Sequence, residues 1–377
     1  MMKNKMKRGI LLLCILAAAG FLLWIYQLNQ IEREPLMETE GREFVKARVL
    51  SVIKDNEEAG AYIGNQTVLL ELLSGSHKGT TVEALSSSSY LYGAHCREGM
   101  KVTTIVSESQ GELVASVYSF YREPILYGFV ALFLLLIWLL GGKQGLCSIG
   151  GLAFTFFCIL YFFLPFIYRG YSPVLGAVIT VILTTIVTMF LIAGFTKKSL
   201  VAMLGTITGV IVAGILAYAF GKFAKVTGYN VSDIENLVYV QEQTGIEISE
   251  LLFSGILIAA LGAVMDVSMS IASSLQEIQE QNPSLGRKEL FQSGMRIGKD
   301  MMGTMSNTLI LAFTGGSINT IVFLYAYAYQ YQQIINMYDI AIEIMQGVAS
   351  SCGVILTVPV SSLLCAVIYT RQNSLQS

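Results

Sequence analysis

An aspartate and several hydroxyl side chains interrupt an apolar stretch of the sequence around residue 266. In GAVMDVSMSIASS, residues 262–274, Asp266 is followed by Ser270 and Ser273 at spacings of four and three. These spacings place the three side chains on one face of a helix. A carboxylate beside hydroxyls can exchange a proton or coordinate a cation, and a charge inside a membrane helix costs about 2.5 to 3.5 kcal/mol. The pattern predicts either an ion or solute pathway or a structural aspartate bonded to a neighbouring helix.

A second polar face follows in the segment that contains MMGTMSNTLILAFTGGSINT, residues 301–320. The amphipathic stretch NPSLGRKELFQSGMRIGKD precedes it and predicts a hairpin at the cytoplasmic interface. Gly315 and Gly316 are expected to unwind or kink this segment. The residues that share the face at helical spacings are Arg296, Asp300, Gly303, Asn307, Thr314 and Ser317.

A hairpin between these two segments would set their polar faces together. We expect Asn307, Thr304 or Thr308 to hydrogen-bond near Asp266. Arg296 would then be placed to offset Asp300 or Glu277. Protonation or ion occupancy of Asp266 would then change during a transport cycle. The residues predicted to line the path are Asp266, Ser270, Ser273, Asn307 and Thr314.

Long apolar helices must carry these faces. The chain is 54% hydrophobic and 13% charged, with a mean hydropathy of +0.62, whereas soluble domains average about 25% charged residues. Apolar runs long enough to span a bilayer occur at residues 9–26, 124–140, 146–168, 174–195, 200–220, 251–275, 301–328 and 348–369. The sequence predicts an α-helical polytopic membrane protein with about eight transmembrane helices.

The distribution of Lys and Arg predicts the orientation of these helices. With the N-terminus inside, the short outer loops hold only Arg169, Lys222 and Lys225, and the other basic residues near the spans are cytoplasmic. We expect a multi-pass protein of the bacterial plasma membrane with both termini cytoplasmic. The first span is favoured as an uncleaved anchor, although Ala17 and Ala19 also offer a signal-peptide cleavage site.

Small residues indicate close helix contacts. They recur every four residues along one face of the fifth predicted span, and two further glycines lie on the polar faces. The residues with this predicted packing role are Gly205, Gly209, Ala213, Gly262 and Gly303.

One soluble domain is expected between the first two spans. Residues 43–122 contain five short β-rich runs separated by turn formers, which predicts a small OB-like or SH3-like barrel on the outer side. The flanking parts are a tail, anchor and linker at 1–42 and a transmembrane helical domain at 123–377. The barrel would either bind a ligand or serve as a rigid docking module. His77 and His95 have no partners at metal-ligand spacing, so no metal site is expected.

Several classes of activity are disfavoured. A net charge of −2 argues against nucleic-acid binding. No H-E-x-x-H or Walker A motif is present, and no histidine lies in any predicted span. We therefore expect no enzymatic activity and no cofactor. Five of the six cysteines lie in apolar stretches, so no disulfide framework is read.

Two sequence blocks carry a family resemblance. GAVMDVSMSIASSLQEI, followed by LFQSGMRIGKDMMGTMSNTLILAFTGG, resembles the hallmark of the YibE/YibF-like family of bacterial multi-pass membrane proteins. The resemblance extends over roughly residues 44–369, and the anchor with its outer β-rich module suggests a YibE-type member. It implies a shorter YibF-type membrane subunit as a partner. The family has no established activity, so the resemblance assigns no site residues.

Two functional hypotheses follow. The first is a membrane transporter or permease component that moves a small solute or ion, coupled to protons or cations through Asp266. The second is a non-transporting assembly or sensing protein that binds an envelope component and a YibF-type subunit, or forms a homo-oligomer. A polar cavity that reaches Asp266 favours transport, whereas an Asp266 packed against another chain favours assembly.

Overall fold

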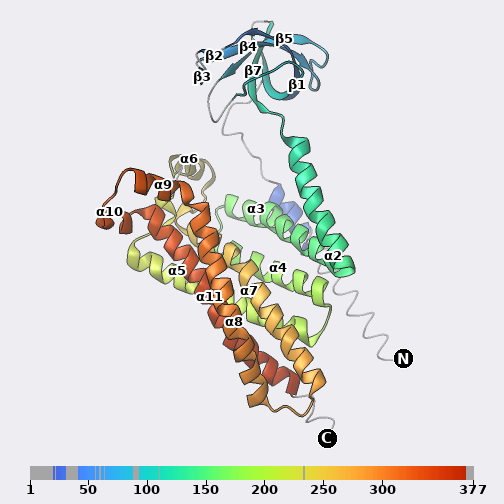
Figure 1. Ribbon diagram of the computed structural model, residues 1–377, viewed down its shortest axis with the longest axis vertical. Helices are drawn as coiled ribbons and strands as arrows, with labels where there is room; N and C mark the ends of the chain where they lie inside the picture. The colour runs from blue at the N-terminus through green and yellow to red at the C-terminus, as the bar shows by residue number, and fades with distance from the viewer. Residues whose placement is uncertain are drawn as a thin grey trace. The chain divides into compact units, whose positions relative to one another are not determined.

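The computed structural model describes residues 20–21, 23–30, 41–55, 57–58, 61–62, 64–87, 93–109, 111–231 and 234–370 (Figure 1). They divide into two compact units. One unit lies within Arg33–Ile137 and the other within Met1–Glu32 and Trp138–Ser377. Most of the predicted first span, including its cleavage site, lies outside the described residues.

The smaller unit contains a closed β-barrel, which confirms the predicted five-stranded domain, and the first part of α2 (Glu123–Cys158). Its strands are β1 (Arg42–Lys54), β4 (Asn65–Leu72), β5 (Thr81–Ser87), β6 (Lys101–Ser109) and β7 (Glu112–Phe120), in the order β1-β4-β5-β7-β6. The short strands β2 (Glu57–Glu58) and β3 (Ala61–Tyr62) form a separate hairpin. Alternate residues such as Val45, Ala47 and Val49 point inward and are buried, as the period of two in a strand requires.

The barrel is sealed between β5 and β7. These strands are parallel and pair over only three residues, 84–86 with 115–117. The segment before β6 reinforces this side, because the Ser86 hydroxyl accepts a hydrogen bond from the Ala94 N–H at 3.0 Å. Gln66 donates to the Cys96 carbonyl at 3.1 Å and accepts from the Cys96 N–H at 2.7 Å. Burial also raises the pKa of the Cys96 thiol, partly opposed by its contact with Ser86.

The second unit is helical. Its elements include the last part of α2 (Glu123–Cys158), the π-helix η1 (Ile159–Phe163), α3 (Leu164–Tyr168), α4 (Pro173–Ala193), α5 (Lys197–Ala224), the 3₁₀ turn η2 (Gly228–Asn230), α6 (Ile234–Thr244), α7 (Ile248–Gln281), α8 (Arg287–Gly316), α9 (Ile318–Ala326), α10 (Tyr331–Ile335) and α11 (Tyr338–Thr370).

Five helical stretches among the described residues are long and apolar enough to cross a membrane. They are Glu123–Tyr168, Pro173–Ala193, Lys197–Ala224, Ile248–Gln281 and Tyr338–Thr370. A sixth is obtained if α8 and α9, which are bent by 62° at Ser317, are taken as one span. The predicted runs 124–140 and 146–168 both fall in the first stretch, which is interrupted at Gly142 by non-helical dihedrals of φ 53° and ψ −129°.

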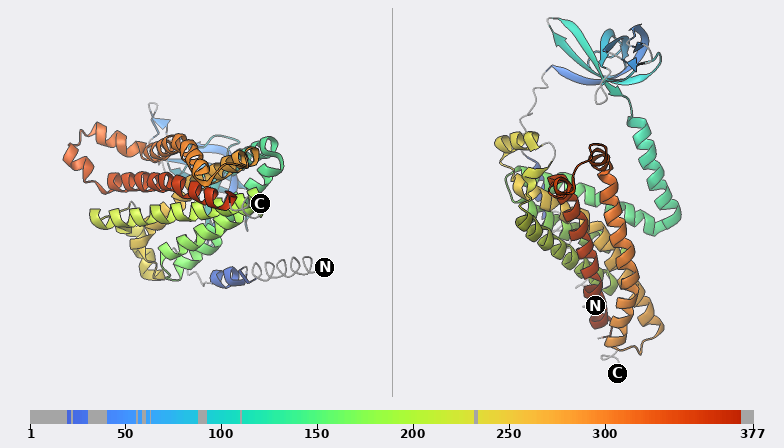
Figure 2. Two further views of the ribbon diagram at one scale, coloured as in Figure 1. Left: turned by 90° about the horizontal axis from the view of Figure 1, so that it is seen from below. Right: turned by 60° about the vertical axis from the view of Figure 1, so that its left-hand side comes forward.

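Helix α11 lies at the centre of the helical unit. It packs against α8, α5 and α7, and α4 lies against α7 (Figures 1 and 2). The period-four small residues of α5 face this contact. A Cβ added at Gly209 would lie 1.8 Å from the Thr357 hydroxyl, and Ala213 is fully buried. Only small side chains allow the helices to approach so closely.

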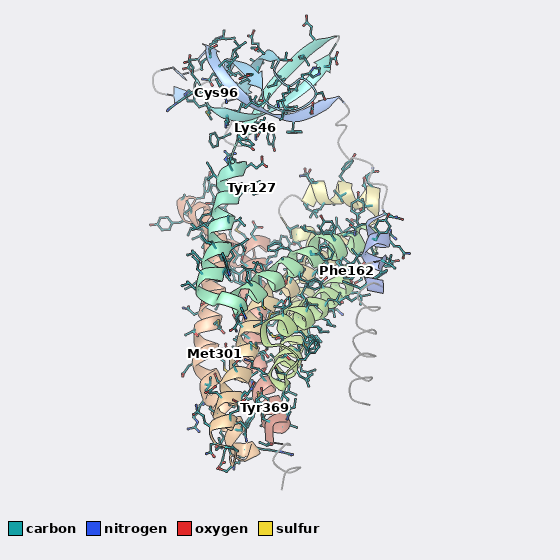
Figure 3. All side chains as sticks on the ribbon, turned by 90° about the vertical axis from the view of Figure 1, so that its right-hand side faces the viewer. Lys46, Cys96, Tyr127, Phe162, Met301 and Tyr369 are labelled. Carbon is teal, nitrogen blue, oxygen red and sulfur yellow. The ribbon has the colours of Figure 1, made fainter. Side chains whose placement is uncertain are left out.

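The helical residues 20–21 and 23–29 pack on the π-helix. Ile25 and Leu28 are buried, and the ring of Trp24 lies 5.0 Å from that of Phe162. The Asn29 amide donates to the Tyr161 carbonyl at 2.6 Å. Figure 3 shows Phe162 beside this segment. These contacts attach the N-terminal part of the described chain to the helical unit.

Candidate functional site

Asp266 lies on the side of α7 that faces away from the bundle. Residues such as Val264, Val267 and Ile271 are fully buried against the neighbouring helices, whereas Asp266 is exposed. A helix turns about 100° per residue, so Asp266 points nearly opposite to Val264. The exposed residues that share its side define the α7 polar face: Gly255, Ala259, Gly262, Asp266, Ser270 and Glu277. Ser273, on the same side, is half-buried.

The polar face of α8 is also exposed. Two glycines determine how this helix packs: Gly294 lies against Ser362 of α11 and Gly298 against Val358. Met301, labelled in Figure 3, continues the side that lies against the core. The polar residues occupy the opposite side. We define the α8 polar face by its exposed members: Arg296, Asp300, Gly303, Asn307 and Thr314. Ser317, at the end of the helix, is half-buried.

The structure does not set the two polar faces against each other within one chain. Because the glycines direct α8 onto α11, its main contact is with α11 and less with α7. Within the described part of the chain, no hydrogen bond joins Asn307 to Asp266, and Arg296 forms no salt bridge with Asp300 or Glu277.

The hydroxyl groups of Thr304 and Thr308 on α8 are bonded within their own helix. The Thr304 hydroxyl donates to the Asp300 carbonyl at 3.2 Å, and the Thr308 hydroxyl donates to the Thr304 carbonyl at 2.9 Å. Such back-bonding satisfies the donor without a neighbouring helix. Asp266, in contrast, has no hydrogen-bond partner among the described residues.

The glycines of the two polar faces lie in open space. A Cβ added at Gly255, Gly262 or Gly303 would meet no other atom within 4 Å. The predicted packing role of Gly262 and Gly303 is therefore not fulfilled inside the chain. By comparison, Gly205 is enclosed, since its added Cβ would lie 2.2 Å from the Ser361 hydroxyl.

Thr314 lies apart from Asp266, in the wall of a pocket between α8, α9 and α11. Glu343 of α11 also lines this pocket. Sequence reasoning missed Glu343 because it lies before the apolar run 348–369. Its spacing of four from Asp339 at the start of the same helix was the available signal.

The described residues contain no group of three or more His, Cys, Asp and Glu side chains that could hold a metal ion. The polar groups on the two faces are the carboxylates of Asp266, Glu277 and Asp300, the Arg296 guanidinium, and hydroxyl and amide groups. Such a set can take up a proton, contact a weakly held cation or hydrogen-bond another polypeptide.

Comparison with known proteins adds one match. A model of the family described as YibE/F-like protein matches residues 129–371, which is more than half of the chain. No curated protein and no solved structure matches the sequence. The matched range includes both polar faces and excludes the barrel. The chain belongs to the YibE/F-like protein family.

Proposed function

We propose that the protein is a subunit of a membrane permease in which the α7 and α8 polar faces form one wall of a pathway for a small solute or ion. A second protein chain would complete that wall, either a YibF-type subunit or another copy. The observation that carries the proposal is the exposure of Asp266 opposite the buried face of α7.

The membrane setting is part of the proposal. The long apolar helices support it, and the exposed side chains of α2, such as Phe129 at 72% and Leu140 at 88%, suit contact with lipid. The basic residues favour both termini in the cytoplasm of a bacterial cell and the barrel outside. The five-stranded closed barrel favours the OB-like alternative, in which loops and one face bind ligands.

Lipid cannot satisfy the two polar faces. An ionised carboxylate in the hydrocarbon core costs about 2.5 to 3.5 kcal/mol, and such residues face protein or water-filled cavities. Within the described part of its own chain, Asp266 faces neither protein nor a water-filled cavity. Another molecule must therefore cover the two polar faces. A polypeptide that also brings polar groups would leave a hydrated path along Asp266, Ser270 and Asn307.

A non-transporting assembly protein is the second candidate. It is favoured by the open glycines of the polar faces, because small residues let a second helix approach closely and Asp266 could then hold it by hydrogen bonds. In this case the contact between chains would be packed and dry.

Transport is tested in liposomes that contain the full-length chain, with and without a co-expressed YibF-type subunit. Proton and sodium flux across the liposome membrane is recorded for each of a series of candidate solutes. Asp266→Asn keeps the size of the side chain and removes its charge. The permease proposal expects a folded but inactive Asn variant and at least partial activity for Asp266→Glu. Wild-type flux in the Asn variant would remove the coupling role of Asp266, and absence of flux with the wild-type chain in both preparations would leave assembly.

Contact between the α7 polar face and a second chain is tested separately by cross-linking. In a chain whose six cysteines are replaced, Ala259→Cys places a thiol on the α7 polar face, and Ile215→Cys places one on the exposed side of α5. We expect residue 259 to form inter-chain disulfides in membranes and residue 215 to form none. Equal cross-linking at both positions would contradict a specific contact at the α7 polar face, and no cross-linking at residue 259 would exclude a second copy as the covering chain.

A further inference from the structure

The bend between α8 and α9 creates a site that does not involve Asp266. Helix α8 ends at Gly316, Ser317 serves as the C-cap of α8 and the N-cap of α9, and α9 continues at 62° to α8. The bend brings Ser317 and Thr320 opposite the first turns of α11, where Asp339 and Glu343 lie. Polar groups from the bend, α9 and α11 therefore meet beside the kink.

Two adjoining pockets occupy this region. A polar pocket of about 280 Å³ is lined by Ser317, Thr320, Asp339 and Glu343, together with neighbouring residues. An apolar pocket of about 230 Å³ lies beside it between α8 and α11, with walls that include Ile310, Phe313, Ile321, Ile344 and Val348. Both pockets have Ser317, Ile340 and Glu343 in their walls. Glu343 thus lies where a polar space meets an apolar one.

The Glu343 carboxylate has an unused acceptor. Glu343 is half-buried. Its Oε2 atom is shielded from solvent and has no hydrogen-bond partner among the described residues. No Lys or Arg is among the residues that line either pocket. A buried carboxylate oxygen is unfavourable unless it is paired. The missing partner must be a donor or a positive charge that enters the pocket.

We infer that these pockets bind an organic cation with an apolar substituent. The cationic group would contact Glu343 and the hydroxyls of Ser317 and Thr320, and Asp339 would add negative charge at the exposed side. The substituent would occupy the apolar pocket against Phe313 and Ile344. The apolar wall distinguishes this ligand from an inorganic cation, which would gain nothing from it. The inference does not depend on the proposed permease activity.

The test measures binding of benzyltrimethylammonium to the full-length protein in lipid nanodiscs by titration calorimetry, with empty nanodiscs subtracted. Glu343→Gln keeps the shape of the side chain and removes its charge. We expect the affinity of this variant to be lower by at least about tenfold. Glu235→Gln, an exposed acidic residue on α6, is the matched control and should bind as wild type does.

The apolar pocket is tested by a second pair. A Cβ added at Gly347 would lie 3.8 Å from Phe313, an ordinary contact, so Gly347→Ala should fold and reduce the apolar space. We expect weaker binding of benzyltrimethylammonium to this variant and unchanged binding of tetramethylammonium. Three results would each overturn the inference: no binding by wild type, equal binding by Glu343→Gln, or equal binding of the uncharged isostere neopentylbenzene.

Discussion

The hydroxyl oxygens of Ser268 on α7 and Ser361 on α11 lie 2.9 Å apart in the fully buried centre of the helical unit. Ser268 donates its proton to the Ala202 carbonyl of α5 at 2.9 Å, so Ser361 must be the donor to Ser268. One hydrogen-bonded chain thereby joins three helices at the point where Gly205 leaves room for it.

Gly205→Ala should destabilise the protein. Its Cβ would lie 2.2 Å from the Ser361 hydroxyl and 2.3 Å from that of Ser268, so both groups must move. Overpacking of this kind costs about 1 to 3 kcal/mol. Thermal unfolding in detergent measures the loss. Gly262→Ala is the matched control, because its Cβ meets no atom within 4 Å and alanine favours the helix. Equal stability of the two variants would contradict the packing described at Gly205.

Gly262→Leu should separate folding from association. The glycine is exposed with no atom near its added Cβ, so the chain should keep its unfolding temperature. The larger side chain would hold a second helix away from the α7 polar face, and we expect loss of the inter-chain disulfide at Ala259→Cys. Thr208→Leu introduces the same side chain on the exposed side of α5 and should leave cross-linking unchanged. Persistence of the cross-link in Gly262→Leu would place the contact elsewhere.

Gln66→Leu should loosen the barrel. Gln66 is 1% exposed and satisfies both main-chain groups of Cys96, which leucine would leave unpaired. Each unsatisfied buried group costs about 1 to 3 kcal/mol. Faster hydrogen exchange at the Cys96 amide and earlier urea unfolding of the barrel are the measurements. Asn65→Leu, at the exposed neighbouring position of β4, should change neither.

The Cys96 thiol should react slowly at neutral pH. Because burial raises its pKa, the folded state keeps the thiol protonated and few thiolates are present to attack a disulfide reagent. The same shift makes its stability contribution complete below the ordinary pKa of 9.0, and that contribution is lost as pH rises through the folded value. Labelling rates with the other five cysteines replaced measure this effect. A Ser76→Cys variant, exposed on the same barrel, should label quickly at pH 7, and an equal rate at Cys96 would refute the expectation.

Local patterns predicted much of the fold. Short β-rich runs separated by turn formers located all five barrel strands, and residues such as Val68 and Leu70 in these runs point inward. The glycine pair at 315–316 indicated the bend that occurs at Ser317. The two-stranded hairpin β2–β3 was not predicted, since its strands have only two residues each.

The relation between the two polar faces could not be predicted in the same way. Periodicity shows that Asp266 and Ser270 share a side of α7, but it does not show whether that side faces a neighbour. The orientation of α8 depends on the fit of Gly294 and Gly298 to Ser362 and Val358, which lie sixty or more residues away. Contacts between distant segments of this kind leave no local pattern.

The three residue pairs that close the barrel also determine when it can finish folding. β5 finds its parallel partner only in β7, the last strand of the unit, so the sealing contact spans about thirty residues. A nascent chain that stops before Glu112 would leave the side of Val82 and Ala84 uncovered and available to chaperones. The maturation of this unit is therefore governed by the arrival of its final strand, immediately before α2 is made.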